Sequence, residues 1–160
     1  MKRLAAIIFS LFPILLVALF SDSTLLRAPA SGAIKHVVFD LDGTLVESLG
    51  FDVPGDVVLD SGEAYRVFPR ARELVDKVWQ SGAKVHFYSG GPQERNLDLL
   101  SKLKLKDGRS FSSVASSILG REDLIDLGDQ AQGEYFTDRY RKDLRKIGEL
   151  ESLIIVEDNR

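Results

Sequence analysis

The sequence predicts an α/β domain in which a mainly parallel β-sheet is flanked by helices. Two observations carry this prediction. Short apolar segments suited to buried strands alternate along the chain with segments of helical periodicity. Three of the expected strands also end in polar residues, as is typical of parallel sheets that bind ligands at the carboxyl ends of their strands.

Length and composition limit what this domain can be. The chain has 160 residues, of which 44% are hydrophobic and 28% charged, so it has room for one domain with a sizeable core. The net charge is −3 and the basic residues are spread along the chain, which argues against a nucleic-acid partner. The sequence contains no cysteine, which excludes disulfides, thiolate catalysis and cysteine-based zinc sites.

Residues 1–30 predict a secretory signal peptide. A positively charged start is followed by an apolar run over residues 4–20 and by the small residues Ala28-Pro29-Ala30. The alternative is an N-terminal anchor that is never removed, although the run is short for a bilayer and Pro13 interrupts it. We therefore expect a secreted or periplasmic domain over residues 31–160, with membrane attachment only if the segment stays uncleaved.

The first half of this domain predicts a strand, a hairpin and a helix. Residues 34–39 (IKHVVF) form a short β-branched and aromatic run, as expected of a buried strand. Residues 56–59 and 63–67 are two extended pieces joined by Asp60-Ser61-Gly62, and we expect them to form a small projecting flap. A helix should begin at Pro69 and end at Gly82, with one apolar face made by Ala71, Leu74, Val75, Val78 and Trp79.

The second half repeats the alternation. Residues 84–88 (KVHFY) predict a strand, which leads through Ser89-Gly90-Gly91-Pro92 into a helix with Leu97, Leu100 and Leu103 on one face. The remaining elements are a short strand over residues 111–115, a polar glycine-bounded segment with one helical turn over 120–133, a charged helix over 138–148 and a strand over 153–156. His36 and His86 lie inside predicted strands, and we expect both to be packing residues.

The predicted strand ends bring carboxylates together. Because side chains alternate along a strand, Asp40 and Asp42 should point the same way while Leu41 turns back to the core. The last strand ends at Glu157-Asp158, at the same edge of a parallel sheet. Carboxylates from the first and last strands could hold one hard cation in oxygen ligands, as Mg²⁺ prefers.

These residues resemble a known family. Residues 40–46 (DLDGTLV) match the first motif of the haloacid dehalogenase (HAD) superfamily, whose members are mostly aspartate-dependent phosphatases. Ser89 is similar to the second motif, Lys142 to the third and Glu157-Asp158 to the fourth. The spacing from residue 141 to residue 159, and Phe68-Pro69-Arg70-Ala71 before the helix, resemble the subgroup of NLI-interacting-factor-like, or small C-terminal-domain, phosphatases.

The resemblance implies a Rossmann-like HAD fold and a role for each matching residue. Asp40 would attack phosphorus and become an aspartyl-phosphate, and Asp42 would transfer protons as general acid and base. Lys142 would neutralise charge on the phosphoryl group, which Thr44, Ser89 and Gly90 would bind. The family binds Mg²⁺, here through Asp40, Asp42 (by its backbone carbonyl) and Asp158, with Glu157 as a neighbouring partner.

The expected function is hydrolysis of a phosphorylated substrate. The interval between the first and second motifs has room for a hairpin flap but no large cap, and such an open site suits a phosphoprotein or another extended substrate. Three alternatives remain: a phosphotransferase, another HAD hydrolase, and a non-catalytic binding module that retains the fold. The family continues past its fourth motif, whereas this sequence stops at Arg160, so a fragment lacking the last strand and helix is also open.

Overall fold

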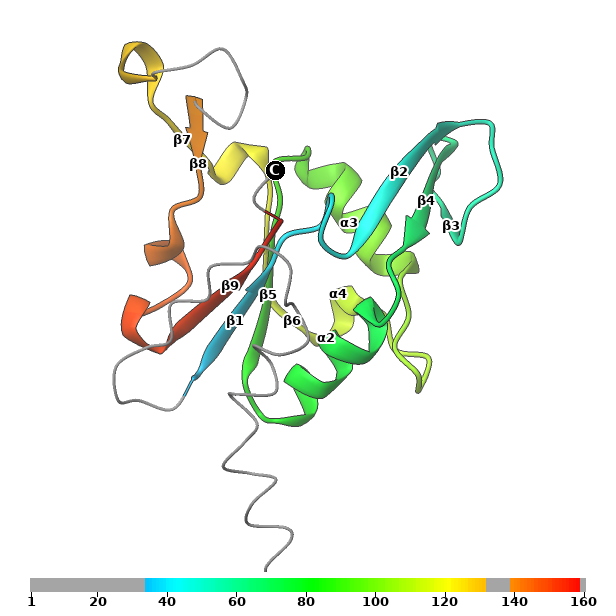
Figure 1. Ribbon diagram of the computed structural model, residues 1–160, viewed down its shortest axis with the longest axis horizontal. Helices are drawn as coiled ribbons and strands as arrows, with labels where there is room; N and C mark the ends of the chain where they lie inside the picture. Colours follow the sequence, from blue (N-terminus) through cyan, green and yellow to red (C-terminus); the bar gives the residue numbers. More distant parts are fainter. Residues whose placement is uncertain (1–33, 132–138, 159–160) are drawn as a thin grey trace, which may run out of the picture.

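The computed structural model describes residues 34–131 and 139–158, and its centre is a parallel four-stranded sheet (Figure 1). The strand order is β6-β5-β1-β9. The four strands are β1 (His36–Phe39), β5 (Lys84–Tyr88), β6 (Ala115–Leu119) and β9 (Leu153–Val156). The predicted α/β class with a parallel sheet is therefore confirmed.

The register of the central strands decides which residues meet at the carboxyl end. Phe39, the last residue of β1, lies opposite Phe87 of β5 on one side and Val156 of β9 on the other. The Asp40 backbone N–H then donates to the Val156 carbonyl at 2.9 Å. Because β1 and β9 run in the same direction and end opposite each other, the residues that follow them leave the sheet next to each other.

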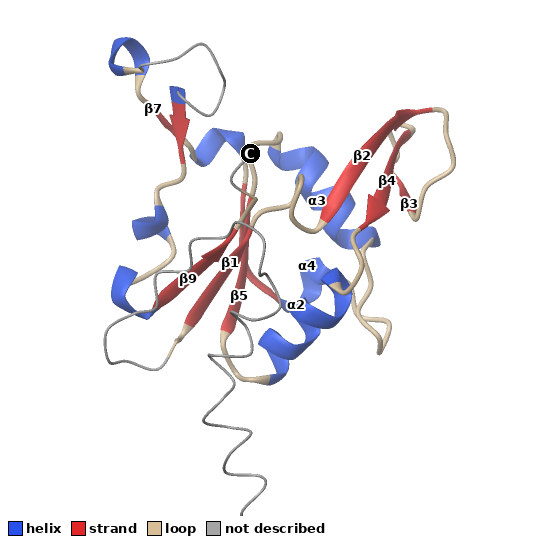
Figure 2. Ribbon diagram, in the orientation of Figure 1, coloured by secondary structure: helices blue, strands red, loops and turns tan. Residues whose placement is uncertain are grey.

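Helices α2 (Ala71–Gln80), α3 (Gln93–Lys102) and α4 (Phe111–Val114) lie together on one side of the sheet (Figure 2). Their apolar faces bury Val75, Leu99 and Phe111 against strand residues such as Phe39 and Phe87. The predicted apolar face of α2 is confirmed.

One detail of α3 is wrong in the sequence-based prediction. Leu97 is 45% exposed, and the buried face is made by Asn96, Leu99 and Leu100. Leu100 and Leu103 of the predicted face are buried as expected. The contacts of α3 with β6 and α4 turn the buried face slightly towards Asn96 and Leu99, and this leaves only Leu97 of the predicted face outside.

The other side of the sheet carries a smaller apolar cluster. Val38, Tyr88 and Leu153 are buried there, and Leu124, Leu144 and Ile147 pack against them. In the described ranges, this face is covered by loops and single 3₁₀ turns rather than by a long helix. The turns next to these residues are Arg121–Asp123, Leu144–Lys146 and Leu150–Ser152, whereas a fourth turn, Gly128–Gln130, contributes nothing to this cluster.

A second, antiparallel sheet forms the flap. The predicted hairpin is confirmed as β3 (Val57–Val58) paired with β4 (Glu63–Val67). Strand β2 (Val46–Phe51) was not predicted and pairs with the other edge of β4, with an irregularity between Ser48 and Gly50. Because β2 is mostly exposed, its sequence lacks the apolar alternation that identifies a strand.

Two predicted elements are wrong. Residues 111–115 do not form a strand: the Ser110 side chain accepts from the Ser113 backbone N–H and starts α4, and the strand β6 follows it. Within residues 139–148 there is no long helix but strand β8 (Tyr140–Arg141), paired with β7 (Ile125–Asp126), and a 3₁₀ turn begun by the Asp143 side chain. At residues 111–114 the local helix cap outweighs the apolar run, whereas at 140–141 pairing with β7 outweighs the helical pattern.

The predicted signal peptide or anchor over residues 1–30 lies outside the described residues, as do residues 132 and 133 of the segment 120–133. Within 34–131 and 139–158, no helix combines the length and apolar character needed to cross a membrane.

Candidate active site

A cavity of about 940 Å³ lies at the carboxyl end of the parallel sheet. The flap contributes Glu63 and Tyr65 to its lining, and the segment around β7 and β8 contributes Leu124, Tyr140 and Arg141. Figure 1 shows these two segments on either side of the strand ends. The charged lining residues are Asp40, Asp42, Glu63, Arg95, Arg121, Arg141, Lys142, Glu157 and Asp158.

The side chain of Asp40 is 20% exposed, which is less than that of Asp42 (46%) or Glu157 (31%). Its Oδ1 accepts the Leu41 backbone N–H at 2.8 Å, and its Oδ2 lies 3.0 Å from Lys142 Nζ. Burial raises the pKa of Asp40 above its ordinary value, and the charge and hydrogen bond of Lys142 oppose this increase. Lys142 therefore favours the ionised form that a nucleophilic carboxylate needs.

Lys142 is held between two carboxylates. Its Nζ donates to Glu157 Oε2 at 2.9 Å in addition to its contact with Asp40, and its side chain is only 15% exposed. Lys142 follows β8, whereas Glu157 follows β9, so the ammonium group joins the ends of two strands. Glu157 therefore forms an ion pair with Lys142, and its expected role beside the metal ligands stays a prediction.

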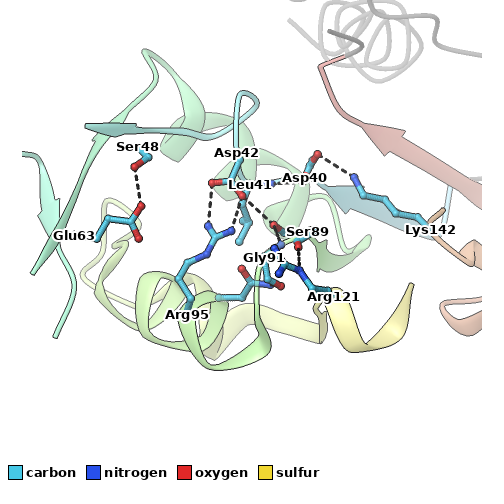
Figure 3. Close-up of polar contacts among 12 residues, drawn as sticks. Asp40, Leu41, Asp42, Ser48, Glu63, Ser89, Gly91, Arg95, Arg121 and Lys142 are labelled. Carbon is cyan, nitrogen blue, oxygen red and sulfur yellow. Dashed lines mark hydrogen bonds and ion pairs between the residues drawn. The ribbon is translucent and has the colours of Figure 1, made fainter. Parts of the chain in front are cut away.

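Asp42 has a different cation. Arg95, from the first turn of α3, donates from Nη1 to Asp42 Oδ1 at 2.9 Å and from Nη2 to Oδ2 at 2.6 Å. The Ser89 hydroxyl donates to the same Oδ2 at 3.0 Å. Figure 3 shows Arg95 and Lys142 reaching the two aspartates from different sides. The like charges of Asp40 and Asp42 are thus each compensated by a separate basic side chain.

The loop after β5 is fixed by hydrogen bonds within the domain. The buried Ser89 hydroxyl accepts from the Gly91 backbone N–H at 3.1 Å, and Asn96 Nδ2 donates to the Gly91 carbonyl at 3.1 Å. Arg121 donates from Nε to the Gly90 carbonyl at 3.0 Å. Gly90 and Gly91 line the cavity, whereas the Ser89 side chain lies beneath it and points to Asp42.

Thr44 and Gly43 connect the end of β1 to the end of β9. The Thr44 hydroxyl accepts from the Asp158 backbone N–H at 2.9 Å, and Thr44 is not among the described residues that line the cavity. Gly43 has a φ of +76°, and a Cβ on it would lie 2.6 Å from Asp158 Oδ2. Only glycine combines this conformation with so close an approach of the Asp158 carboxylate.

Oxygen donors gather around Gly43. The Asp158 carboxylate packs over the backbone of Gly43, directly after the Asp42 carbonyl, and both Asp40 and Asp158 line the cavity. Two carboxylates and one backbone carbonyl are oxygen ligands of the kind that Mg²⁺ takes, with the rest of its shell left to water. The described residues contain no cluster of three or more acidic or histidine side chains suited to a metal.

The structure brings together most of the predicted site residues and adds others. Asp40, Asp42, Gly90, Lys142 and Asp158 line one cavity, while Thr44 and Ser89 support it from behind. The unpredicted lining residues include Arg95, Tyr65, Arg121 and Tyr140.

Arg95 could have been found from the sequence, because it lies within the first turn of the helix that follows the glycine loop. In that position its side chain can reach the sheet edge. No feature of the sequence indicated that Tyr65 of the flap or Tyr140 of β8 would line the cavity.

A scan against protein-family models and a search of curated proteins both find no significant match to this chain. A functional proposal must therefore start from the geometry of the cavity and the chemistry of its residues.

Proposed function

We propose that this protein is a magnesium-dependent phosphatase of the HAD type, which hydrolyses phosphomonoesters through an aspartyl-phosphate. The observation that supports it best is that one cavity gathers Asp40, Asp42, Lys142 and Asp158 at the ends of the sheet strands. This set contains a nucleophile, a second carboxylate for proton transfer, a cation for the phosphoryl charge and a further oxygen ligand.

The reaction proceeds in two steps. An Asp40 carboxylate oxygen attacks phosphorus, the bond from phosphorus to the leaving oxygen breaks, and Asp42 gives that oxygen a proton. Water then attacks the phosphorus of the aspartyl-phosphate, Asp42 takes a proton from the water, and Asp40 and inorganic phosphate are released. Lys142 neutralises charge on the phosphoryl oxygens, and Glu157 holds Lys142 in place.

Asp40, the Asp42 carbonyl and Asp158 would hold Mg²⁺. When bound, the ion supplies positive charge that lessens the repulsion between an anionic nucleophile and an anionic phosphoryl group. Gly43 keeps Asp158 close enough to take part.

The substrate proposed is a phosphoprotein or another extended phosphomonoester. Between β1 and β5 the structure has only the small flap sheet and α2, so the flap borders the cavity without enclosing it as a separate cap domain would. We also propose that residues 1–30 direct the domain to a secreted or periplasmic location. Cell fractionation and N-terminal sequencing of the mature chain separate this from a retained membrane anchor.

The test is hydrolysis of an aryl phosphate by the purified chain, with Mg²⁺ and with a chelator. Asp40→Asn should abolish turnover, because an amide is a far weaker nucleophile than a carboxylate. Asp126→Asn is the matched control, because Asp126 also forms an ion pair, with Arg139, but does not line the cavity. We expect it to retain full activity.

Turnover that survives in Asp40→Asn would refute the aspartyl-phosphate mechanism. Turnover that is lost equally in Asp126→Asn would indicate a general loss of folding, which circular dichroism would show. A folded protein without activity would favour the binding-module alternative, and phosphate transfer to an added alcohol in preference to water would favour a phosphotransferase.

A further inference from the structure

Arg95, a basic side chain of the cavity, is hydrogen-bonded to Asp42, the proposed proton-transfer group. Arg95 donates a hydrogen bond to each carboxylate oxygen of Asp42, and the Ser89 hydroxyl donates a third hydrogen bond to Oδ2. Arginine can only donate hydrogen bonds, so Asp42 is held here purely as an acceptor. In this arrangement Asp42 cannot present a proton to a leaving oxygen.

The surroundings of Arg95 are shaped around its guanidinium group. Gly91 lies directly against it, so that a Cβ at this position would overlap the guanidinium nitrogens. From the flap, the ring of Tyr65 lies 5.9 Å from Arg95 Cζ. The Arg95 side chain is 17% exposed, and it lines the same cavity as Asp40.

A phosphoryl group competes with Asp42 for this guanidinium. Arginine binds phosphate oxygens with the same paired geometry that it uses for a carboxylate. A phosphomonoester dianion carries twice the charge of the Asp42 carboxylate, so it is the stronger partner once it enters the cavity. A phosphodiester, with a single negative charge, lacks this advantage.

We propose that Arg95 holds Asp42 when the cavity contains no substrate and transfers to the phosphoryl oxygens when a phosphomonoester binds. This exchange frees Asp42 for proton transfer only when a dianionic substrate is present. It would make Arg95 a substrate-binding residue that selects monoesters over diesters, and it rests on the proposed phosphatase function.

The experiment measures binding of inorganic phosphate by calorimetry, with Mg²⁺ present, together with kcat and KM for the aryl phosphate. The variants are Arg95→Gln, which removes the charge, and Arg95→Lys, which keeps the charge but lacks the planar pair of N–H groups that matches two oxygens of one phosphoryl group. Arg66→Gln is the matched control, because Arg66 pairs with Glu47 on the exposed flap and does not line the cavity.

We expect Arg95→Gln to weaken phosphate binding by about 10-fold to 100-fold, the usual effect of losing hydrogen bonds to a charged group, with a parallel increase in KM. Arg95→Lys should fall between it and the wild type, and Arg66→Gln should bind phosphate normally. If Arg95 only positioned Asp42, kcat would fall in Arg95→Gln while phosphate affinity stayed unchanged. That result would overturn the proposal, as would a wild-type protein that binds no phosphate.

The two proposals fail in different ways. Phosphate binding that depends on Arg95, in a protein without turnover, would support Arg95 as a phosphoryl-binding residue and reject the phosphatase. Turnover that depends on Asp40, with phosphate affinity indifferent to Arg95, would support the phosphatase and reject this role of Arg95.

Discussion

Acidification should destabilise this fold through His86. The side chain is only 4% exposed, in the middle of the parallel sheet. Its Nε2 lies 3.0 Å from His36 Nδ1, and its Nδ1 lies 2.7 Å from the Ser117 hydroxyl. Burial, followed by the charges of His36 and Lys84, lowers the pKa of His86 from 6.5 to about 4.

The sign of the effect follows from which state binds the proton. In the unfolded chain, His86 binds a proton as the pH falls below 6.5. In the folded protein, His86 stays neutral until the pH approaches about 4. The folded protein therefore keeps its full stability above the pKa that His86 has in the unfolded chain. It loses stability as the pH falls from that value towards the lower pKa that His86 has in the folded protein. Between pH 7.5 and pH 5 the loss from this group amounts to about 2 kcal/mol.

The assay is urea denaturation of the wild type and of His86→Gln at the two pH values. Carboxylates that titrate in this range affect both proteins alike, so the difference between their pH dependences isolates His86. The wild type should lose about 2 kcal/mol more than His86→Gln. His36→Gln should remove less of the dependence, because burial and not His36 is the largest cause of the shift. Equal losses in the wild type and His86→Gln would refute the reasoning.

Two further predictions concern the cavity. Lys142→Gln removes the charge that opposes the effect of burial on Asp40, so the pKa of Asp40 should rise further. Turnover should fall about 100-fold because the charge on the phosphoryl group is no longer neutralised. The acidic limit of turnover should also move to higher pH, and a pH–rate profile measures this shift. Gly43→Ala should cost about 1–2 kcal/mol for its positive φ alone, and more for the contact with Asp158. Gly108→Ala, with a similar φ and open space around it, is its control in urea denaturation, and only Gly43→Ala should also lose stabilisation by Mg²⁺.

The sequence by itself determined the elements that its local pattern encodes. Continuous apolar runs identified β1, β5 and β9, and each run stopped at the polar residues Asp40, Ser89 and Glu157. Helix α2 and the hairpin of β3 and β4 followed in the same way from periodicity and turn residues. Because parallel strands end at one edge of a sheet, these local features were enough to predict that the acidic residues would meet.

The tertiary structure alone decided the elements and contacts that depend on distant partners. Strands β2, β6 and β8 exist because neighbouring strands pair with them, although their own sequences are polar or irregular. Arg95 meets Asp42 across 53 residues of chain, and His86 meets His36 across 50. Such contacts are set by sheet register and helix placement, which arise from packing of the whole chain and leave no periodic trace in the residues that make them.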